Sequence, residues 1–204
     1  MSLGLVDLIF VGGASFLLYR AVQRQAPQPA DAGAPRWRAM SAMALAPAHV
    51  RAPEGAGDLP RAIVEVRRSD RDFFPEGVER AAGECFRLVH AALVMRDAGN
   101  IRGRLMPEMY GVLKGQAAAL KGARRFRHVE RLEIDAAQLA ELWQERGQDV
   151  ATVHVVSRLI DYTTDSTGSV VAGSKTTPAR VSQGWTFTRP TGPYAWRLAA
   201  IEPR

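Results

Sequence analysis

Apolar and polar positions divide the chain into an apolar opening run, an irregular stretch and a long segment with regular spacing. Between Leu3 and Val22 the only charged residues are Asp7, near the start, and Arg20, near the end. A helix of this length extends roughly 30 Å, which is the thickness of the hydrocarbon core of a bilayer. The pattern therefore predicts one transmembrane helix within residues 1–24.

Two other interpretations of this opening segment fit its sequence less well. A cleaved export signal begins with positive charge and ends at small residues, whereas here Arg20 and Arg24 follow the apolar run. A buried core helix needs a neighbour to pack on, and a proline-rich stretch follows instead. Because basic residues that flank a span stay in the cytoplasm, we expect the N-terminus outside and the remainder of the chain in the cytoplasm.

Residues 25–58 are dense in Pro, Ala and Gly and show no sustained periodicity. Such a composition is typical of a tether between an anchor and a folded domain. The domain itself is therefore expected to occupy residues 59–204.

Helical spacing returns at the start of that domain. Apolar residues within 59–66 recur at helical intervals and predict a short amphipathic helix. Pro75 opens a longer helix that we expect to end near Gly99, and Pro107 opens a third. Cys85 falls on the apolar stripe of the second helix, so we expect a small buried side chain rather than a nucleophile.

From Phe126 onward the period changes to that of strands. Segments 128–143, 150–163, 179–188 and 194–203 are rich in β-branched and aromatic residues and are separated by turn signals. The first of them also contains a stretch that is compatible with a helix. Helices followed by an antiparallel meander predict an α+β domain with the helices on one face of the sheet. Alternation along the last segment places Tyr194, Trp196 and Leu198 on one strand face.

Composition and the absence of known motifs exclude several classes of protein function. The single cysteine excludes an intramolecular disulfide framework and an all-cysteine zinc site. The net charge of +6 is carried mostly by arginine and favours contact with anionic surfaces, although a codon bias toward arginine explains it equally well. No Walker loop, GxGxxG, GxSxG or pair of histidines at metal spacing occurs. We therefore expect no cofactor, no metal site and no DNA partner.

The densest basic run is KGARRFRHVER, at the junction between the third helix and the first strand. Such a cluster suits anionic lipid head groups or ribosomal RNA, and a solvated surface loop is the alternative. The candidate binding residues of this run are Lys121, Arg124, Arg125, Arg127 and Arg131.

Five segments together resemble the Tim44-like family, named for the matrix-side tethering subunit of the mitochondrial inner-membrane protein translocase. They are FFPEGVERAAGECFRLVHAAL, LMPEMYGVLKGQAAAL, HVERLEIDAAQLAEL, DVATVHVVSRLIDYTTD and GWTFTRPTGPYAWRLAAIEP, which span roughly Asp70 to Pro203. The resemblance implies a cone-shaped fold similar to nuclear transport factor two (cystatin-like), in which a curved sheet encloses an apolar pocket. Tyr110, Trp185, Phe187 and Trp196 are the candidate residues of that pocket or of the adjoining core.

The same resemblance implies a single-pass protein of the bacterial inner membrane. Its expected role is that of a non-enzymatic adaptor in protein translocation or membrane-protein assembly, with membrane lipid, proteins of those pathways or a ribosome as partners. The long N-terminal region by which the mitochondrial subunit engages its import motor has no counterpart here, so motor recruitment is not expected.

A pocket enzyme, or a binding protein for small hydrophobic ligands, is the alternative that the ketosteroid-isomerase-like fold leaves open. Such enzymes use a carboxylate base and a tyrosine-acid pair, and Asp161, Tyr162, Tyr110 and Asp135 supply these residue types. Asp161 and Tyr162 are adjacent in a strand and face opposite ways, which disfavours them as a catalytic pair.

Overall fold

A computed structural model describes residues 52–204 of the protein. The predicted anchor (residues 1–24) and most of the predicted linker (residues 25–58) lie outside the described residues. Between residues 52 and 204, no helix is both long and apolar enough to cross a membrane.

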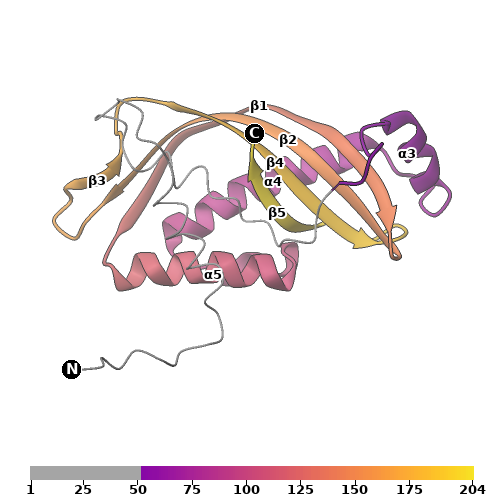
Figure 1. The fold of residues 1–204 in the computed structure, drawn as a ribbon. Coiled ribbons are helices and arrows are strands. Elements are labelled where there is room, and N and C mark those ends of the chain that lie inside the picture. The colour runs from indigo at the N-terminus through magenta and orange to yellow at the C-terminus, as the bar shows by residue number, and fades with distance from the viewer. Residues whose placement is uncertain (1–51) are drawn as a thin grey trace, which may run out of the picture. The chain divides into compact units, whose positions relative to one another are not determined.

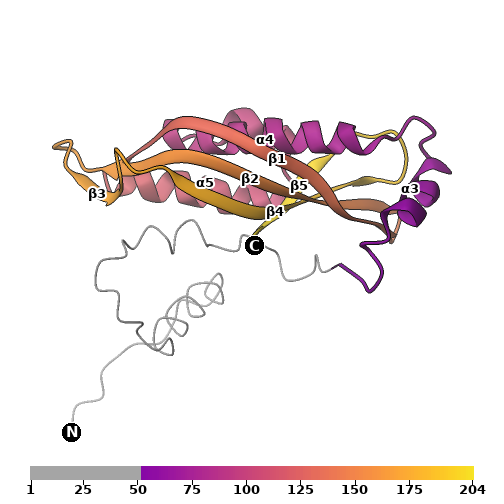
Figure 2. The same ribbon diagram turned by 90° about the horizontal axis from the view of Figure 1, so that it is seen from above.

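The elements are α3 (Leu59–Arg67), α4 (Pro75–Met95), the 3-10 helix η1 (Gly99–Arg104), α5 (Pro107–Gly122), β1 (Phe126–Glu145), β2 (Gln148–Thr164), β3 (Val170–Gly173), β4 (Ala179–Pro190) and β5 (Arg197–Pro203). The helices α4 and α5 lie on one side of a single curved antiparallel sheet, as the sequence predicted, and α3 lies at one end of it (Figures 1 and 2). The strands are ordered β1-β2-β4-β5, and β3 pairs with the far end of β2. This α+β arrangement fits a fold similar to nuclear transport factor two.

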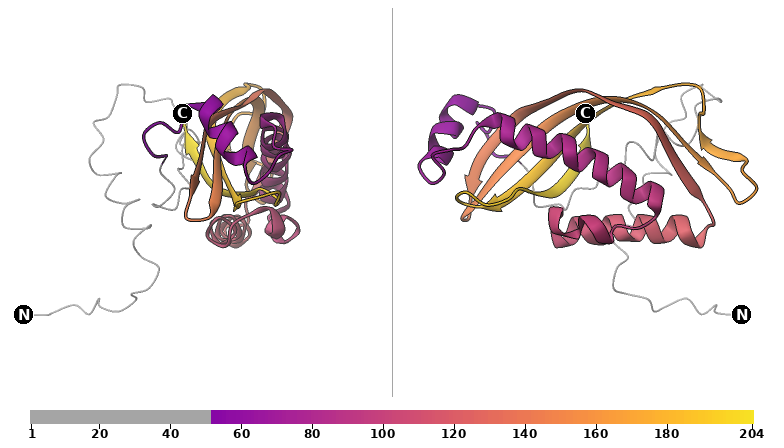
Figure 3. Two further views of the ribbon diagram at one scale, coloured as in Figure 1. Left: turned by 90° about the vertical axis from the view of Figure 1, so that its right-hand side faces the viewer. Right: turned by 180° about the vertical axis from the view of Figure 1, so that it is seen from behind.

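The long helix α4 crosses the sheet obliquely, and α5 lies beneath it (Figure 3). Pro75 and Pro107 each stand in the first turn of their helix, where a missing N–H costs nothing. The helix α4 ends at Met95, four residues before the expected Gly99, because Arg96 adopts a left-handed conformation with φ of 54°. Gly99 instead begins η1.

The curvature of the sheet originates in β1. This strand is continuous over its whole length, and its ambiguous central stretch is a strand and not a helix. Its pairing with β2 shifts register at three places, and Arg131 occupies the first of these irregularities with φ of 50°. Bulges of this kind bend a strand and increase its twist, which explains the arch in Figure 1.

The strand segments differ from the sequence expectation at two places. Residues 170–173, expected to be part of a turn region, form the short strand β3. The last strand begins only at Arg197, so Tyr194 and Trp196 precede it instead of sharing a strand face with Leu198. Gly192 has φ of 121° and accepts a hydrogen bond from the Tyr194 N–H, so a tight turn occupies the expected start of the strand.

The core lies between α4 and the concave face of the sheet. Trp185 and Phe187 of β4 are both 1% exposed, and the ring of Trp185 packs 5.2 Å from that of Phe86 on α4. Cys85 is also buried, and burial raises the pKa of its thiol to about 12, opposed by nearby Arg104. The expectation that Cys85 is an inert core residue agrees with this environment.

The free edge of β1 is partly covered by groups that accept its unpaired N–H groups. Glu79 of α4 accepts a hydrogen bond from the Leu139 N–H at 2.8 Å, and the carbonyl of Ala56 accepts one from Leu142 at 2.9 Å. Ala56 is itself buried. These hydrogen bonds occupy backbone groups of the edge strand that could otherwise pair with a strand of another chain.

Candidate functional site

One end of the domain gathers cations from α4, α5 and β1 around exposed apolar side chains. At this end α5 passes into β1 and β3 projects, while α3 lies at the opposite end (Figure 1). We call this set of residues the tip: Met95, Arg96, Lys121, Arg124, Arg125, Phe126 and Val170.

Backbone turns hold the cations of the tip in place. The Arg124 N–H donates to the Lys121 carbonyl at 3.0 Å, and the Arg125 N–H donates to the Leu120 carbonyl at 2.9 Å. Arg124 has φ of 50°, which ends the helix and turns the chain into β1. Lys121 and Arg124 are exposed and Arg125 is half-buried. Three of the five predicted basic residues therefore lie together near the bulk solvent.

The aromatic residue of the basic run connects three elements. The guanidinium of Arg96 lies 4.2 Å from the centre of the Phe126 ring, a cation–π contact between the end of α4 and the start of β1. Phe126 pairs with Thr164 of β2, which pairs in turn with Val170 of β3. Arg96, Phe126 and Val170 are thus brought to the same end of the domain, although they come from distant parts of the sequence.

A carboxylate beside the tip is held in its charged form. The pKa of Asp165 is lowered, first by hydrogen bonds from the side chain and backbone of Thr167, then by the Ser169 N–H and the positive charge of Arg125. Asp165 is engaged by hydrogen bonds within its own loop, and within residues 52–204 Arg125 forms no salt bridge.

Arg127, the fourth predicted basic residue, faces the concave side and has a partner. Its Nε and Nη2 atoms donate to the two carboxylate oxygens of Asp161 at 3.0 and 2.6 Å. Nη2 also lies 3.3 Å from Nδ1 of His90 on α4. Arginine only donates hydrogen bonds, so His90 accepts at Nδ1 and carries its proton on Nε2. Burial, and secondly the charge of Arg127, lower the pKa of His90 to about 3.

Arg131, the fifth, stands apart from the tip on the first irregularity of β1 and is exposed. The structure thus brings together Lys121, Arg124 and Arg125 and separates them from Arg127 and Arg131.

The four residues predicted to line an apolar pocket occupy different environments. Trp185 and Phe187 are fully buried in the packed core. Tyr110 and Trp196 are partly buried against that core. Arg102 lies over the ring of Tyr110, and Arg189 lies over that of Trp196. A ligand pocket formed by these four residues stays a prediction.

The candidate catalytic residues do not converge on one point. Asp161 is bound by Arg127 on the concave face. The Tyr162 hydroxyl donates to Glu130 at 2.8 Å, and this hydrogen bond is the main reason that the pKa of Tyr162 is raised. Asp135 accepts from Arg158 at 3.0 Å. Each group has a local partner of its own.

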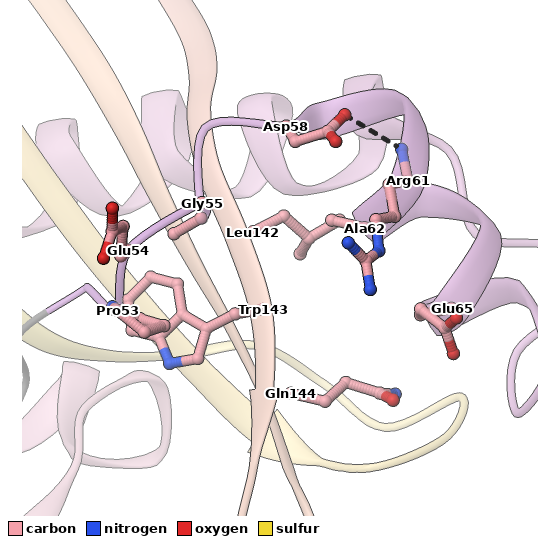
Figure 4. Close-up of a pocket in the computed structure, with 11 residues that line it drawn as sticks. Pro53, Glu54, Gly55, Asp58, Arg61, Ala62, Glu65, Leu142, Trp143 and Gln144 are labelled. Atoms are coloured by element: carbon pink, nitrogen blue, oxygen red, sulfur yellow. Dashed lines mark hydrogen bonds between the residues drawn. The ribbon is translucent and has the colours of Figure 1, made fainter.

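A cleft of about 440 Å³ lies at the α3 end, between residues 53–58, α3 and the last part of β1 (Figure 4). Leu142 and Trp143 contribute its apolar wall, and the indole Nε1 of Trp143 is buried without a partner among the described residues. Two of its three carboxylates are engaged: Asp58 accepts from the Arg61 N–H, and Glu65 pairs with Arg68. No sequence pattern indicated this cleft, because residues 53–65 and 142–144, which line it, are far apart along the chain.

Sequence reasoning also missed Met95, Arg96 and Val170 as members of the tip. Their exposure depends on where α4 ends and on the existence of β3. The sequence placed the helix end near Gly99 and predicted no strand at residues 170–173. Gly99, three residues after Arg96, was the local sign of a helix end.

Comparison with known families identifies the domain. The family model for the Tim44-like domain matches residues 59–203, which is well over half of the chain and includes every helix and strand from α3 to β5. A search of curated proteins finds no match. At the level of the family, the match supports a membrane-associated, translocation-related adaptor role. The chain belongs to the Tim44-like family.

Proposed function

We propose that this protein is a membrane-anchored, non-enzymatic adaptor of the bacterial inner membrane that assists protein translocation or membrane-protein assembly. The family match supports the general role. The observation that carries the finer proposal is the cluster of cations at one end of the domain, where Lys121 and Arg124 are exposed and Arg125 is half-buried.

The anchor and the tether determine where the domain acts. A single span within residues 1–24, with its N-terminus outside, places the domain in the cytoplasm. The tether then keeps the domain at a high local concentration beside the bilayer, so that contacts too weak to recruit a free protein become populated.

Under these conditions the cations of the tip bind anionic lipid head groups. Each cation close to a negatively charged bilayer contributes about 1 kcal/mol, and the attraction fades within about one Debye length. Lys121, Arg124 and Arg125 therefore orient a tethered domain rather than recruit it. Arg127 is left out of this role, because its guanidinium is bound by Asp161.

An adaptor needs no reacting group, and the environments of the candidate carboxylates agree with that. The Asp161 carboxylate accepts hydrogen bonds from Arg127 and the Asp135 carboxylate accepts them from Arg158, so oxygens of both groups already have a partner within the domain.

Affinity purification of the full-length chain from detergent-solubilised host membranes tests the proposal. Translocation components, membrane proteins under assembly or ribosomes are expected to be enriched over a tag-only control. A triple variant, Lys121→Ala with Arg124→Ala and Arg125→Ala, is expected to lose part of this set. A matched variant, Arg61→Ala with Arg71→Ala and Arg146→Ala, removes three exposed cations elsewhere and should retain it. Recovery of no membrane-associated protein by the wild type contradicts the proposal.

A further inference from the structure

The last part of β1 has backbone groups that face away from the sheet. The Leu142 N–H does so, because it donates to the carbonyl of Ala56, outside the sheet, at 2.9 Å. Backbone groups two residues apart in a strand point the same way, and β1 pairs with β2 without a register shift from residue 141 to residue 145. The N–H and the carbonyl of Gln144 therefore face outward as well. Within residues 52–204, no group from outside the sheet pairs with them.

Gln144 is exposed and is one of the residues that line the cleft beside α3 (Figure 4). The volume of this cleft, about 440 Å³, lies within the usual range of ligand sites, about 300–1,000 Å³. Trp143 in its wall is 8% exposed, and the indole Nε1 has no acceptor within residues 52–204. Buried donors without an acceptor are rare in native proteins. The cleft thus combines outward backbone groups, an apolar wall and a donor that lacks an acceptor.

The charged residues of the cleft are mostly acidic, in a protein whose net charge is +6. Three carboxylates, of Glu54, Asp58 and Glu65, line it together with one guanidinium, that of Arg61. Asp58 accepts from the Arg61 N–H and Glu65 pairs with Arg68. Glu54 is exposed and has no ion-pair or hydrogen-bond partner within residues 52–204. A cation on a bound chain is therefore complementary to this cleft.

We propose that the cleft binds an extended segment of a partner protein, which adds a strand to the edge of β1 at Gln144 and carries a lysine or arginine beside an apolar residue. Addition of a strand to a sheet edge is a common mode of peptide recognition, in which main-chain hydrogen bonds give affinity and side-chain contacts give specificity. The apolar residue packs on the wall of the cleft and the cation lies at Glu54. This inference rests on the proposed adaptor function and names the form in which a partner is held.

Two other occupants fit the cleft differently. A helical segment uses its own backbone N–H and carbonyl groups within the helix, so it has none to pair with Gln144. The protein's own residues 35–51 include Arg36, Arg38 and Arg51, so a test has to separate this segment from a partner.

Fluorescence anisotropy with the detergent-solubilised full-length protein and defined peptides tests the inference. The probe is a fluorescein-labelled peptide TVRVTVRT, which alternates side chains as a strand does. One control peptide carries N-methyl groups on alternate backbone nitrogens, which removes donors but keeps every side chain. A second control has glutamate in place of both arginines. The protein variants are Glu54→Arg and its matched control Glu108→Arg, at an exposed residue of α5. A further variant, Gln144→Pro, removes the outward N–H but no hydrogen bond of the sheet. Thermal unfolding checks that each variant is folded.

We expect saturable binding of TVRVTVRT, and affinities at least about tenfold lower for both control peptides and for the Glu54→Arg and Gln144→Pro proteins. Glu108→Arg should bind as the wild type does. Equal affinities for the TVRVTVRT peptide and its N-methylated form would overturn the inference, and so would equal affinities of the Glu54→Arg and Glu108→Arg proteins. Binding that occurs only after Arg36→Glu with Arg38→Glu would assign the cleft to the protein's own chain and overturn the choice of a partner. The adaptor function is tested separately by the copurified proteins, so a failure of peptide binding leaves that function standing.

Discussion

The Nη2 atom of Arg189 lies 2.8 Å from Oδ2 of Asp70, and both side chains are almost excluded from solvent. Asp70 belongs to the segment between α3 and α4, whereas Arg189 is near the end of β4. The same guanidinium donates from Nε to Asp149 at 2.9 Å and lies 4.4 Å from the centre of the Trp196 ring. The Arg189 side chain thus links four parts of the domain: the segment before α4, strands β2 and β4, and the segment before β5.

Removing Arg189 is expected to destabilise the domain strongly. The substitution Arg189→Met keeps most of the apolar volume but leaves Asp149 and Asp70 buried without a counter-charge, which typically costs about 3–5 kcal/mol. Urea unfolding measures the loss. Arg146→Met, at a residue whose side chain is 90% exposed, serves as the control and should change stability by less than about 0.5 kcal/mol. An Arg189→Met protein as stable as that control would show that the buried network contributes nothing.

The Arg127 and Asp161 pair makes a weaker but coupled contribution. Both side chains are 17% exposed, so we expect Arg127→Ala to cost about 1–3 kcal/mol by leaving the Asp161 carboxylate without its two donors. Asp161→Ala should cost a similar amount. The double variant should lose clearly less than the sum, since either single change already breaks the pair. Additive losses in a double-mutant cycle would mean that the two side chains stabilise the fold independently.

Acid is expected to weaken the fold through His90. Its pKa is about 6.5 in the unfolded chain and about 3 in the folded domain, because burial and Arg127 both oppose a charged ring. Between these values only the unfolded chain binds the proton. Stability is therefore complete above pH 6.5 and falls as pH decreases, by up to about 1.4 kcal/mol per pH unit. Urea unfolding between pH 7.5 and pH 5.5 should show a smaller slope for His90→Gln than for the wild type. Equal slopes would place the acid sensitivity on other groups.

Cys85 should react only after the domain opens. Burial raises the pKa of its thiol to about 12, so at pH 8 the folded protein has almost no thiolate. We expect alkylation to be at least about tenfold slower in the folded domain than in urea. Rapid labelling of the native protein would indicate that α4 leaves the sheet frequently.

The helices and the main strands were predictable because their signals are local. Pro75 and Pro107 indicated helix starts, and the β-branched and aromatic residues from Phe126 onward indicated the strands. The length of α4 was not predictable in the same way, since it depends on a left-handed Arg96. The strand β3 is short and exists only because it pairs with the end of β2.

Only part of the candidate site could be predicted from the sequence, because the partners of its residues depend on the fold. A run of cations in the sequence shows which residues are basic, but it does not show which of them face an acid across the fold. Arg127 lies two residues from Arg125 yet is bound by Asp161 from the neighbouring strand. Conversely, Val170 joins the tip through the pairing of β3 with β2, which no short sequence window contains.

The central claim, that this protein assists the insertion or assembly of membrane proteins, is tested most directly by an insertion assay. Membrane vesicles from host cells that lack the protein receive a newly synthesised membrane protein, with or without the purified full-length chain reconstituted beforehand. The account predicts that reconstitution raises the rate of insertion and that the triple alanine variant of Lys121, Arg124 and Arg125 restores less of it. Equal insertion rates with and without the protein, across several membrane-protein substrates, would contradict the claim.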